Sequence, residues 1–262
     1  MNGRLKPLKR FGQNYLTDKN TINKIISEFN PAKDDEVLEI GPGTGSLTSL
    51  LFDKVKKYTA VEIDSRVIDE LKIKFPSVEI INDDILDIDL KEISLHKFRV
   101  IGNIPYNITS PIIFKLIANR TLINDAMFMV QYEVAKRITA QRGTKDYGIL
   151  GVLVNYFAET ELCFKISPNV FYPKPKVFSA IVHLKFRELE DGIIEDKLLI
   201  QTVKAAFGNR RKTLKNSLRN SIFAEVNFDS LSYLLTKRAE ELALKDFIEL
   251  ASLIKRNNSL PL

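Results

Sequence analysis

Short apolar runs alternate with amphipathic helical patterns through the first two thirds of the chain. The runs are rich in valine and isoleucine, and most are followed by a segment in which apolar residues recur at helical spacing. Strands and helices that alternate in this way form a mostly parallel sheet, so the pattern predicts an α/β fold. The predicted strands cover residues 37–40, 58–63, 78–85, 98–102, 126–131, 152–157, 162–166 and 179–186.

The pattern changes after the last predicted strand. Residues 187–197 are charged and contain Gly192, which is typical of a linker. Beyond them, apolar residues recur at helical spacing to about residue 257. We therefore expect an α/β domain over residues 1–188 and a small all-helical domain over residues 189–262.

Composition excludes several classes of protein. The chain has 262 residues, 45% of them hydrophobic, with one cysteine and two histidines. The single Cys163 rules out a disulfide framework, and histidines without neighbouring ligands argue against zinc, so we expect no metal. No apolar run is long enough to span a membrane, and no secretory signal is recognisable. These features predict a cytoplasmic protein without a membrane partner.

The positive charge of the chain is concentrated in two segments. The net charge is +6, and residues 1–17 and 197–224 contain cations but no acid. In the second segment the cations flank an apolar stripe, as in a helix that contacts structured RNA; a solvated helix face is the alternative. The candidate RNA-binding residues are Arg210, Arg211, Lys212, Lys215 and Arg219.

A glycine-rich turn follows the first predicted strand. The sequence V-L-E-I-G-P-G-T-G places Gly41 and Gly43 between a strand and a helix, where α/β proteins bind nucleotide-like ligands. Glu62 lies about 20 residues further on, where an acid commonly accepts the hydroxyls of a ribose. Asp84 ends the next strand and could accept the amino group of an adenine. A charged strand end and a solvated turn are the alternatives for these two acids.

The stretch V-I-G-N-I-P-Y-N, residues 100–107, carries the fourth strand into a rigid turn. Pro105 fixes its own φ and pushes Ile104 toward an extended conformation. The Asn103 side-chain oxygen and the Ile104 carbonyl could then accept both hydrogens of an exocyclic amine and direct its lone pair at a methyl donor. Tyr106 could stack on the base, a contact worth about 1–3 kcal/mol. A plain proline turn with a core tyrosine is the alternative.

A second aromatic candidate lies in N-V-F-Y-P-K-P-K-V, residues 169–177. Two prolines separated by one residue make this segment stiff and extended. Phe171 could therefore cover the other face of a base that stacks on Tyr106. A position in the hydrophobic core is the alternative for Phe171.

Four motifs in this order resemble the ribosomal RNA adenine dimethyltransferases: F-G-Q-N-Y-L, E-I-G-P-G-T-G-S-L-T, V-E-I-D and G-N-I-P-Y-N. The resemblance covers about residues 8–255 and is greatest to the bacterial small-subunit (KsgA-type) branch. It implies a seven-stranded, Rossmann-like class I methyltransferase fold with a C-terminal helical domain, and S-adenosylmethionine as cofactor. The family usually has an acid where this chain has Phe178. By motif, the implied cofactor contacts are Asn14, Leu16, Gly41, Gly43, Glu62, Asp84 and Asn103.

The resemblance also implies a reaction and a partner. Methyl groups would pass to N6 of two adjacent adenines in the 3′-terminal hairpin of small-subunit rRNA, giving N6,N6-dimethyladenosine. The partner would be this rRNA or the immature small subunit, and the enzyme would be a monomer without an obligatory protein partner. The implied catalytic residues are Asn103, Ile104, Pro105, Tyr106 and Phe171.

Three alternatives remain open from the sequence. The first is a macrolide-resistance type enzyme that dimethylates one adenine of large-subunit rRNA, although Q-N-Y-L, N-I-T-S-P and A-F-G-N-R-R-K-T-L favour the small-subunit branch. The second is a DNA adenine methyltransferase, which typically has an acid where this chain has Asn103. The third is a ribosome-assembly factor that acts mainly by binding the immature subunit.

Overall fold

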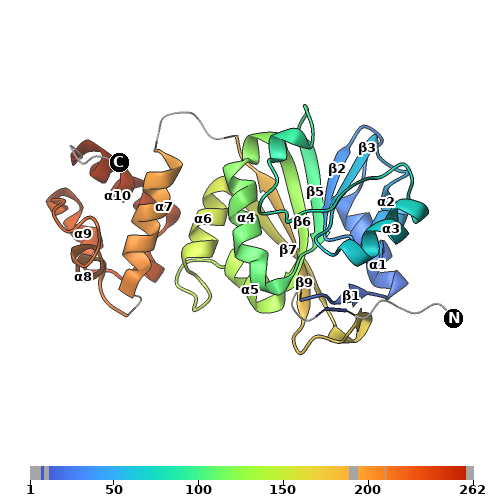
Figure 1. The fold of residues 1–262 in the computed structure, drawn as a ribbon. Helices are drawn as coiled ribbons and strands as arrows, with labels where there is room; N and C mark the ends of the chain where they lie inside the picture. Colours follow the sequence, from blue (N-terminus) through green and yellow to red (C-terminus); the bar gives the residue numbers. More distant parts are fainter. Residues whose placement is uncertain (1–6, 9–11, 189–193, 210, 258–262) are drawn as a thin grey trace. The chain divides into compact units, whose positions relative to one another are not determined.

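The computed structural model describes residues 7–8, 12–188, 194–209 and 211–257 (Figure 1). The chain folds into two compact units, a sheet unit within residues 1–135 and 159–187 and a helical unit within residues 136–158 and 188–262. The sequence analysis predicts that residues 136–158 belong to the α/β domain, whereas in the structure they group with the C-terminal helices.

The sheet unit is built on seven strands in the order β4-β3-β2-β5-β6-β9-β7. The first five of these strands are parallel to one another, and β9 is antiparallel to β6. The predicted seven-stranded α/β sheet is therefore confirmed. The strands are β2 (Glu36–Ile40), β3 (Lys57–Val61), β4 (Glu79–Ile81), β5 (Phe98–Asn103), β6 (Ile123–Gln131), β7 (Ala158–Ile166) and β9 (Ser179–Phe186).

Helices cover both faces of this sheet because successive strand residues point to opposite sides. Val37, Ile101 and Met127 pack in one hydrophobic cluster with α1 (Lys19–Phe29), α2 (Thr48–Leu51) and α3 (Ser65–Lys74). The residues next to them in the strands face the other side, which α4 (Thr109–Ala118) covers in Figure 1. Helix α5 (Tyr132–Ile138) follows β6 directly.

The local sequence explains why α1 forms and which face it buries. Ile22, Ile25, Ile26 and Phe29 recur at helical spacing and are all buried. The Asp18 side chain accepts the backbone N–H of Thr21 at 2.7 Å and so caps the helix. The helix therefore begins immediately after the N-terminal segment that crosses the sheet edge.

That N-terminal segment is held by a two-stranded ribbon. Strand β1 (Tyr15–Leu16) pairs antiparallel with β8 (Phe171–Tyr172), and Leu16 lies opposite Phe171. The backbone N–H of Thr17 donates to the Val170 carbonyl at 2.9 Å. This pairing fixes residues 15–17 beside the carboxyl edge of the large sheet.

The prediction of a strand over residues 152–157 is wrong. These residues lie in α6 (Ile149–Phe157), and β7 starts at the next residue. The buried residues of this helix are Gly151, Val152, Leu153, Val154 and Phe157. Because the run is apolar on every side, it shows clearly neither the helical period nor the alternation of a strand.

The helical unit packs α6 with α7 (Asp196–Ala206), α8 (Leu214–Arg219), α9 (Ser232–Leu235) and α10 (Leu244–Asn257). Phe207 stacks on Phe247 with ring centroids 5.9 Å apart, and the Tyr147 hydroxyl donates to the Leu242 carbonyl at 3.0 Å. The predicted helical character after the linker is confirmed. Within the described ranges, no helix combines the length and apolar character that a membrane crossing requires.

Strands β2 and β5 leave no room for a side chain at Gly102, which lies opposite Ile40. A Cβ atom at Gly102 would overlap the Ile40 carbonyl oxygen, which belongs to the backbone and cannot move aside. We expect Gly102→Ala to lower the free energy of unfolding by about 1–3 kcal/mol in urea titrations. Gly208→Ala is the matched control because nothing lies within 4 Å of its added Cβ. Equal stability of the two variants would contradict this account of the strand contact.

Candidate active site

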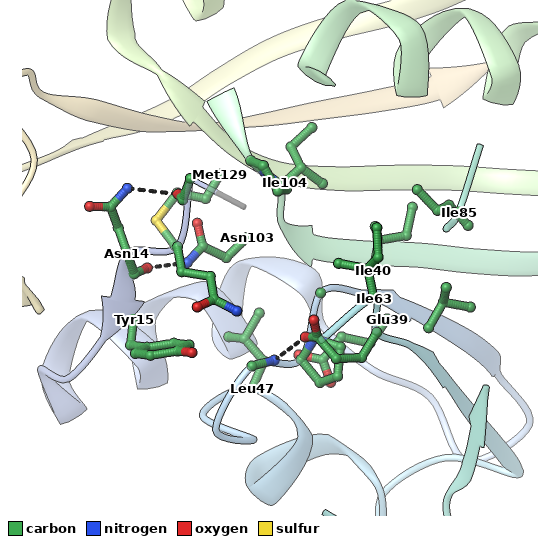
Figure 2. Close-up of a pocket in the computed structure, with 18 of the residues that line it drawn as sticks. Asn14, Tyr15, Glu39, Ile40, Leu47, Ile63, Ile85, Asn103, Ile104 and Met129 are labelled. Carbon is green, nitrogen blue, oxygen red and sulfur yellow. Dashed lines mark hydrogen bonds between the residues drawn. The ribbon is translucent and has the colours of Figure 1, made fainter. Parts of the chain in front are cut away.

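A pocket lies at the carboxyl ends of β2, β3 and β5 (Figure 2). The parallel register places Ile40 opposite both Val61 and Gly102, so the three strands end at the same level. Ten of the residues predicted from the sequence line this pocket together. They are Asn14, Leu16, Gly41, Gly43, Glu62, Asp84, Asn103, Ile104, Pro105 and Tyr106.

The turn after β2 requires glycine for two separate reasons. Gly41 and Gly43 have φ values of +71° and +56°, a left-handed conformation that other residues rarely adopt. A Cβ atom on Gly43 would also lie 2.9 Å from Cε1 of Tyr15. The backbone of the turn therefore packs directly against Tyr15 of the N-terminal segment. A residue with a side chain at Gly43 would prevent this contact.

Glu62 is fixed by two backbone bonds at the end of β3. Its carboxylate oxygens accept the N–H of Gly43 at 3.0 Å and the N–H of Asp64 at 2.9 Å. Burial raises the pKa of Glu62 above its ordinary value, although these bonds act in the opposite direction. A carboxylate can accept about four hydrogen bonds, so Glu62 retains capacity for two ligand hydroxyls.

Asn103 is oriented by a residue far away in the sequence. Its Nδ2 donates to the backbone carbonyl of Asn14 at 2.7 Å, as Figure 2 shows. Asn14 in turn donates from its own Nδ2 to the Gly12 carbonyl at 3.0 Å. Because the carbonyl of Asn14 can only accept, the bond fixes the amide orientation and leaves Oδ1 of Asn103 as an acceptor.

Tyr106 stands beside this amide and is also fixed. Its hydroxyl lies 2.6 Å from Oγ of Ser179, the first residue of β9. Burial raises the pKa of Tyr106, so the ring stays neutral at physiological pH. A neutral, immobilised aromatic ring is suited to stacking on a planar ligand.

Two residues of the N-terminal segment belong to the site although sequence reasoning assigned them no role. Nε2 of Gln13 donates to Asp64 at 2.8 Å, which ties the segment to the end of β3. The Tyr15 hydroxyl is buried and has no hydrogen-bond partner among the described residues. Burial, together with Asp64 and Glu62, raises the pKa of Tyr15 to about 12. The motif did not indicate the contact of Gln13 because its partner Asp64 is distant in sequence.

A second buried acid, Glu39, lies below the turn. It is 1% exposed, and its Oε2 accepts the hydroxyls of Thr48 at 2.5 Å and Tyr58 at 2.8 Å. Burial raises the pKa of Glu39 to about 7. Its charge therefore changes near neutral pH, beside the pocket that it helps to line.

Phe171 is not brought to the pocket with the other predicted catalytic residues. It is 5% exposed and packs in the hydrophobic cluster with Leu16 and Ile181. Its pairing with Leu16 in the small ribbon turns the side chain into the core. The structure therefore favours the core alternative over a position against the base.

The predicted RNA-binding cations lie in the helical unit, on and just before α8. Arg210 lies outside the described residues. Leu214 and Leu218 are buried, so the helix has a clear inner face. The remaining candidates, all exposed, are Arg211, Lys212, Lys215 and Arg219.

A glycine turn after the first strand of a seven-stranded sheet, with an acid after the second, is typical of Rossmann-like folds that bind nucleotide-type ligands, and class I methyltransferases are one group of them. The family model described as "Ribosomal RNA adenine dimethylase" matches residues 4–255. The chain belongs to this family, and the expected fold and enzyme class are confirmed.

Individual relatives agree with this assignment. The chain is 42% identical to Ribosomal RNA small subunit methyltransferase A of Chlorobium phaeobacteroides, covering 94% of this chain and 91% of the relative. It is 41% identical to the protein of the same name in Legionella pneumophila, over 96% and 99% of the two chains.

Solved structures show the same architecture. A dimethyladenosine transferase from Plasmodium falciparum superposes with a TM-score of 0.80 at 28% identity, over 92% of this chain and 98% of that one. The 23S rRNA methyltransferase ErmE superposes with a TM-score of 0.68 at 29% identity, over 90% and 98%.

The buried Glu39 makes stability depend on pH. Its pKa is about 7 in the folded protein and 4.5 ordinarily, so between these values only the folded state holds the proton. The contribution of Glu39 to the free energy of unfolding therefore falls as pH rises from about 4.5 to 7. Glu39→Gln keeps an acceptor for Thr48 and Tyr58 but removes the titration. We expect the free energy of unfolding of Glu39→Gln, relative to that of wild type, to rise by about 3 kcal/mol from pH 4.5 to pH 7.

Urea titrations at several pH values measure this difference. Glu92→Gln makes the same chemical change at an exposed position and is the control. A pH-independent difference between Glu39→Gln and wild type would contradict the assignment of the titration to Glu39.

Proposed function

We propose that this protein transfers methyl groups from S-adenosylmethionine to N6 of two adjacent adenines in the 3′-terminal hairpin of small-subunit rRNA. The product is N6,N6-dimethyladenosine, formed during biogenesis of the small subunit. The observation that carries the proposal is the Asn103 amide, oriented by the Asn14 carbonyl at the mouth of a nucleotide-type pocket. The names of the relatives from Chlorobium and Legionella support the small-subunit branch over a large-subunit substrate.

The pocket residues fit the nucleoside part of the cofactor. Glu62 has the capacity to accept both ribose hydroxyls while its two backbone bonds persist. Ile63 is 42% exposed, an unusual state for isoleucine, and lies with Ile40 and Ile85 on one side of the pocket in Figure 2. These apolar side chains form a slot for the adenine ring. One oxygen of Asp84 accepts the N–H of Leu86, which leaves the other for the adenine amino group.

The N-terminal segment fits the amino-acid part of the cofactor. Asn14 and Leu16 line the pocket together with the glycine turn and extend it beyond the ribose position at Glu62. The unpartnered Tyr15 hydroxyl lies beside the same turn and is a donor available once the segment adjusts. When bound, S-adenosylmethionine supplies a methyl group activated by its sulfonium charge.

The turn after β5 positions the substrate amine. Oδ1 of Asn103 and the carbonyl of Ile104 accept the two N6 hydrogens and direct the nitrogen lone pair at the methyl group. Both oxygens also stabilise the positive charge that develops on N6 during transfer. Pro105 keeps the two acceptors in a fixed relation, and Tyr106 stacks on the adenine ring. Extracting the base from its stack costs a few kcal/mol, which favours an unpaired loop nucleotide.

The helical unit supplies affinity for the RNA backbone. The cations of α8 and of the turn before it are exposed, whereas Leu214 and Leu218 of the same helix are buried. Such a face neutralises phosphates without reading sequence. We assign it to binding of the rRNA and assign the chemistry to the sheet unit.

A methyl-transfer assay with labelled S-adenosylmethionine tests the proposed function. The substrates are unmethylated small subunits, naked small-subunit rRNA, large-subunit rRNA and DNA, with the product mapped by nuclease digestion and mass spectrometry. We expect dimethyladenosine at two adjacent positions of the small-subunit RNA. Label only in large-subunit rRNA would support the resistance-type alternative. Tight subunit binding without any label would make the protein an assembly factor.

Asn103→Ala should abolish most turnover. The substitution removes an acceptor that is needed most in the transition state, so we expect kcat to fall by about 10²–10³-fold. RNA binding, measured separately by fluorescence anisotropy, should change little because the turn contributes few backbone contacts. Wild-type turnover in this variant would refute the positioning role.

Neutralising cations near α8 should weaken RNA binding and its salt dependence. For Arg211→Gln combined with Lys212→Gln, the slope of log K against log salt should decrease by about two. Lys33→Gln combined with Lys91→Gln is the control, since it removes the same charge from other exposed positions. An equal change of slope in both double variants would show that only net charge matters.

A further inference from the structure

A strip of apolar and basic side chains remains exposed beside the pocket in the sheet unit. Tyr172 is 49% exposed, Val177 40% and Phe178 46%, although residues of these types are usually buried. The exposed Lys174 and Lys176 alternate with them along the chain. No acid occurs between residues 162 and 178, so the strip is uniformly cationic. We call residues 172–178, together with Lys165 of β7, the aromatic strip.

The Phe178 ring is held in place although it is exposed. Nζ of Lys165 lies 3.9 Å from the centroid of the Phe178 ring and 4.5 Å from that of Tyr132. The carbonyl of Phe178 accepts the backbone N–H of Tyr132 at 2.9 Å. A cation against an aromatic face restricts the motion of the ring. The side chain is therefore already ordered for binding a partner.

The position of the ring relates it directly to the substrate turn. Ser179 is the next residue, and it is fully buried with its Oγ at 2.6 Å from the Tyr106 hydroxyl. Ser179 pairs with Gln131 at the end of β6 that carries Met129, a residue of the pocket. The aromatic strip therefore begins where the proposed base-binding turn ends.

The chemistry of the strip favours single-stranded RNA over a protein partner. Lysine is depleted in protein–protein interfaces, whereas aromatic rings between lysines are typical of surfaces that bind unpaired nucleotides. The lysines complement phosphates, and an exposed ring provides a stacking face for any base. A flipped adenine leaves its neighbour without a stacking partner, which such a ring can replace.

We propose that Phe178 is a stacking platform for the unpaired nucleotide next to the target adenine, with Lys174 and Lys176 contacting its phosphates. This inference rests on the proposed function for the identity of the RNA. Lys165 is a positioning residue that holds the ring.

The chain contains no tryptophan, which permits a direct test. Phe178→Trp introduces a single fluorophore at the platform, and Leu95→Trp places one at a position that is 97% exposed elsewhere in the sheet unit. A fluorescently labelled hairpin RNA with an unpaired loop serves as the probe, its binding followed by anisotropy. We expect saturable quenching of the tryptophan emission in Phe178→Trp and none in the Leu95→Trp control. RNA binding without quenching in Phe178→Trp would overturn the inference.

Kinetics separate stacking from simple apolar contact. For Phe178→Ala we expect the KM for RNA to rise about 5–100-fold, while kcat at saturating RNA and cofactor binding stay unchanged. Phe178→Tyr should restore the wild-type KM, whereas Phe178→Leu should not, because it keeps apolar area without a ring. Wild-type KM in Phe178→Leu would overturn the stacking role. The fluorescence measurement needs no methyl transfer, so failure of the proposed function and failure of the platform are distinguishable.

Discussion

The hydrogen bond from Asn103 to the Asn14 carbonyl is the interaction on which the site depends. It joins two segments 89 residues apart and sets which atom of the amide remains an acceptor. Several other contacts hold the N-terminal segment in the position that this bond requires. Gln13 ties it to Asp64, and the pairing of Leu16 with Phe171 fixes its far end. The proposed base-binding turn is therefore complete only when the N-terminal segment is in place.

Two buried acids, Glu39 and Glu62, determine the electrostatics of the pocket that they line. Glu39 and Glu62 both have a raised pKa because burial opposes their ionisation. The fold offsets this cost with hydroxyl donors at Glu39 and backbone N–H donors at Glu62. Carboxylates retained in this way favour ligand hydroxyls and a cationic ligand over an anionic one. The same bonds fix the glycine turn to the end of β3, so the electrostatics and the shape of the site have one structural origin.

The sequence predicted the sheet and most of the pocket because parallel strands end at a common edge. It did not predict the contacts made across that edge. Asn103 and Asn14 are too distant in sequence for their bond to be read from a motif, and the same holds for Gln13 with Asp64. The predicted strand over residues 152–157 is part of helix α6 instead, because an apolar run that is buried on every side has no clear period. The buried position of Phe171 depends on the pairing of β8 with β1. Each of these strands has two residues, and the local sequence does not predict their pairing.

The most direct test of the site is a crystal structure with S-adenosylhomocysteine, the demethylated form of the proposed cofactor. We predict ribose hydroxyls on the Glu62 carboxylate, the adenine beside Ile63 and Ile85, and its amino group on Asp84. The sulfur should face the Asn103 amide, with the bond from Asn103 to Asn14 intact. Binding outside this pocket, or a complex in which the Asn103 side chain turns away from the sulfur, would contradict the account.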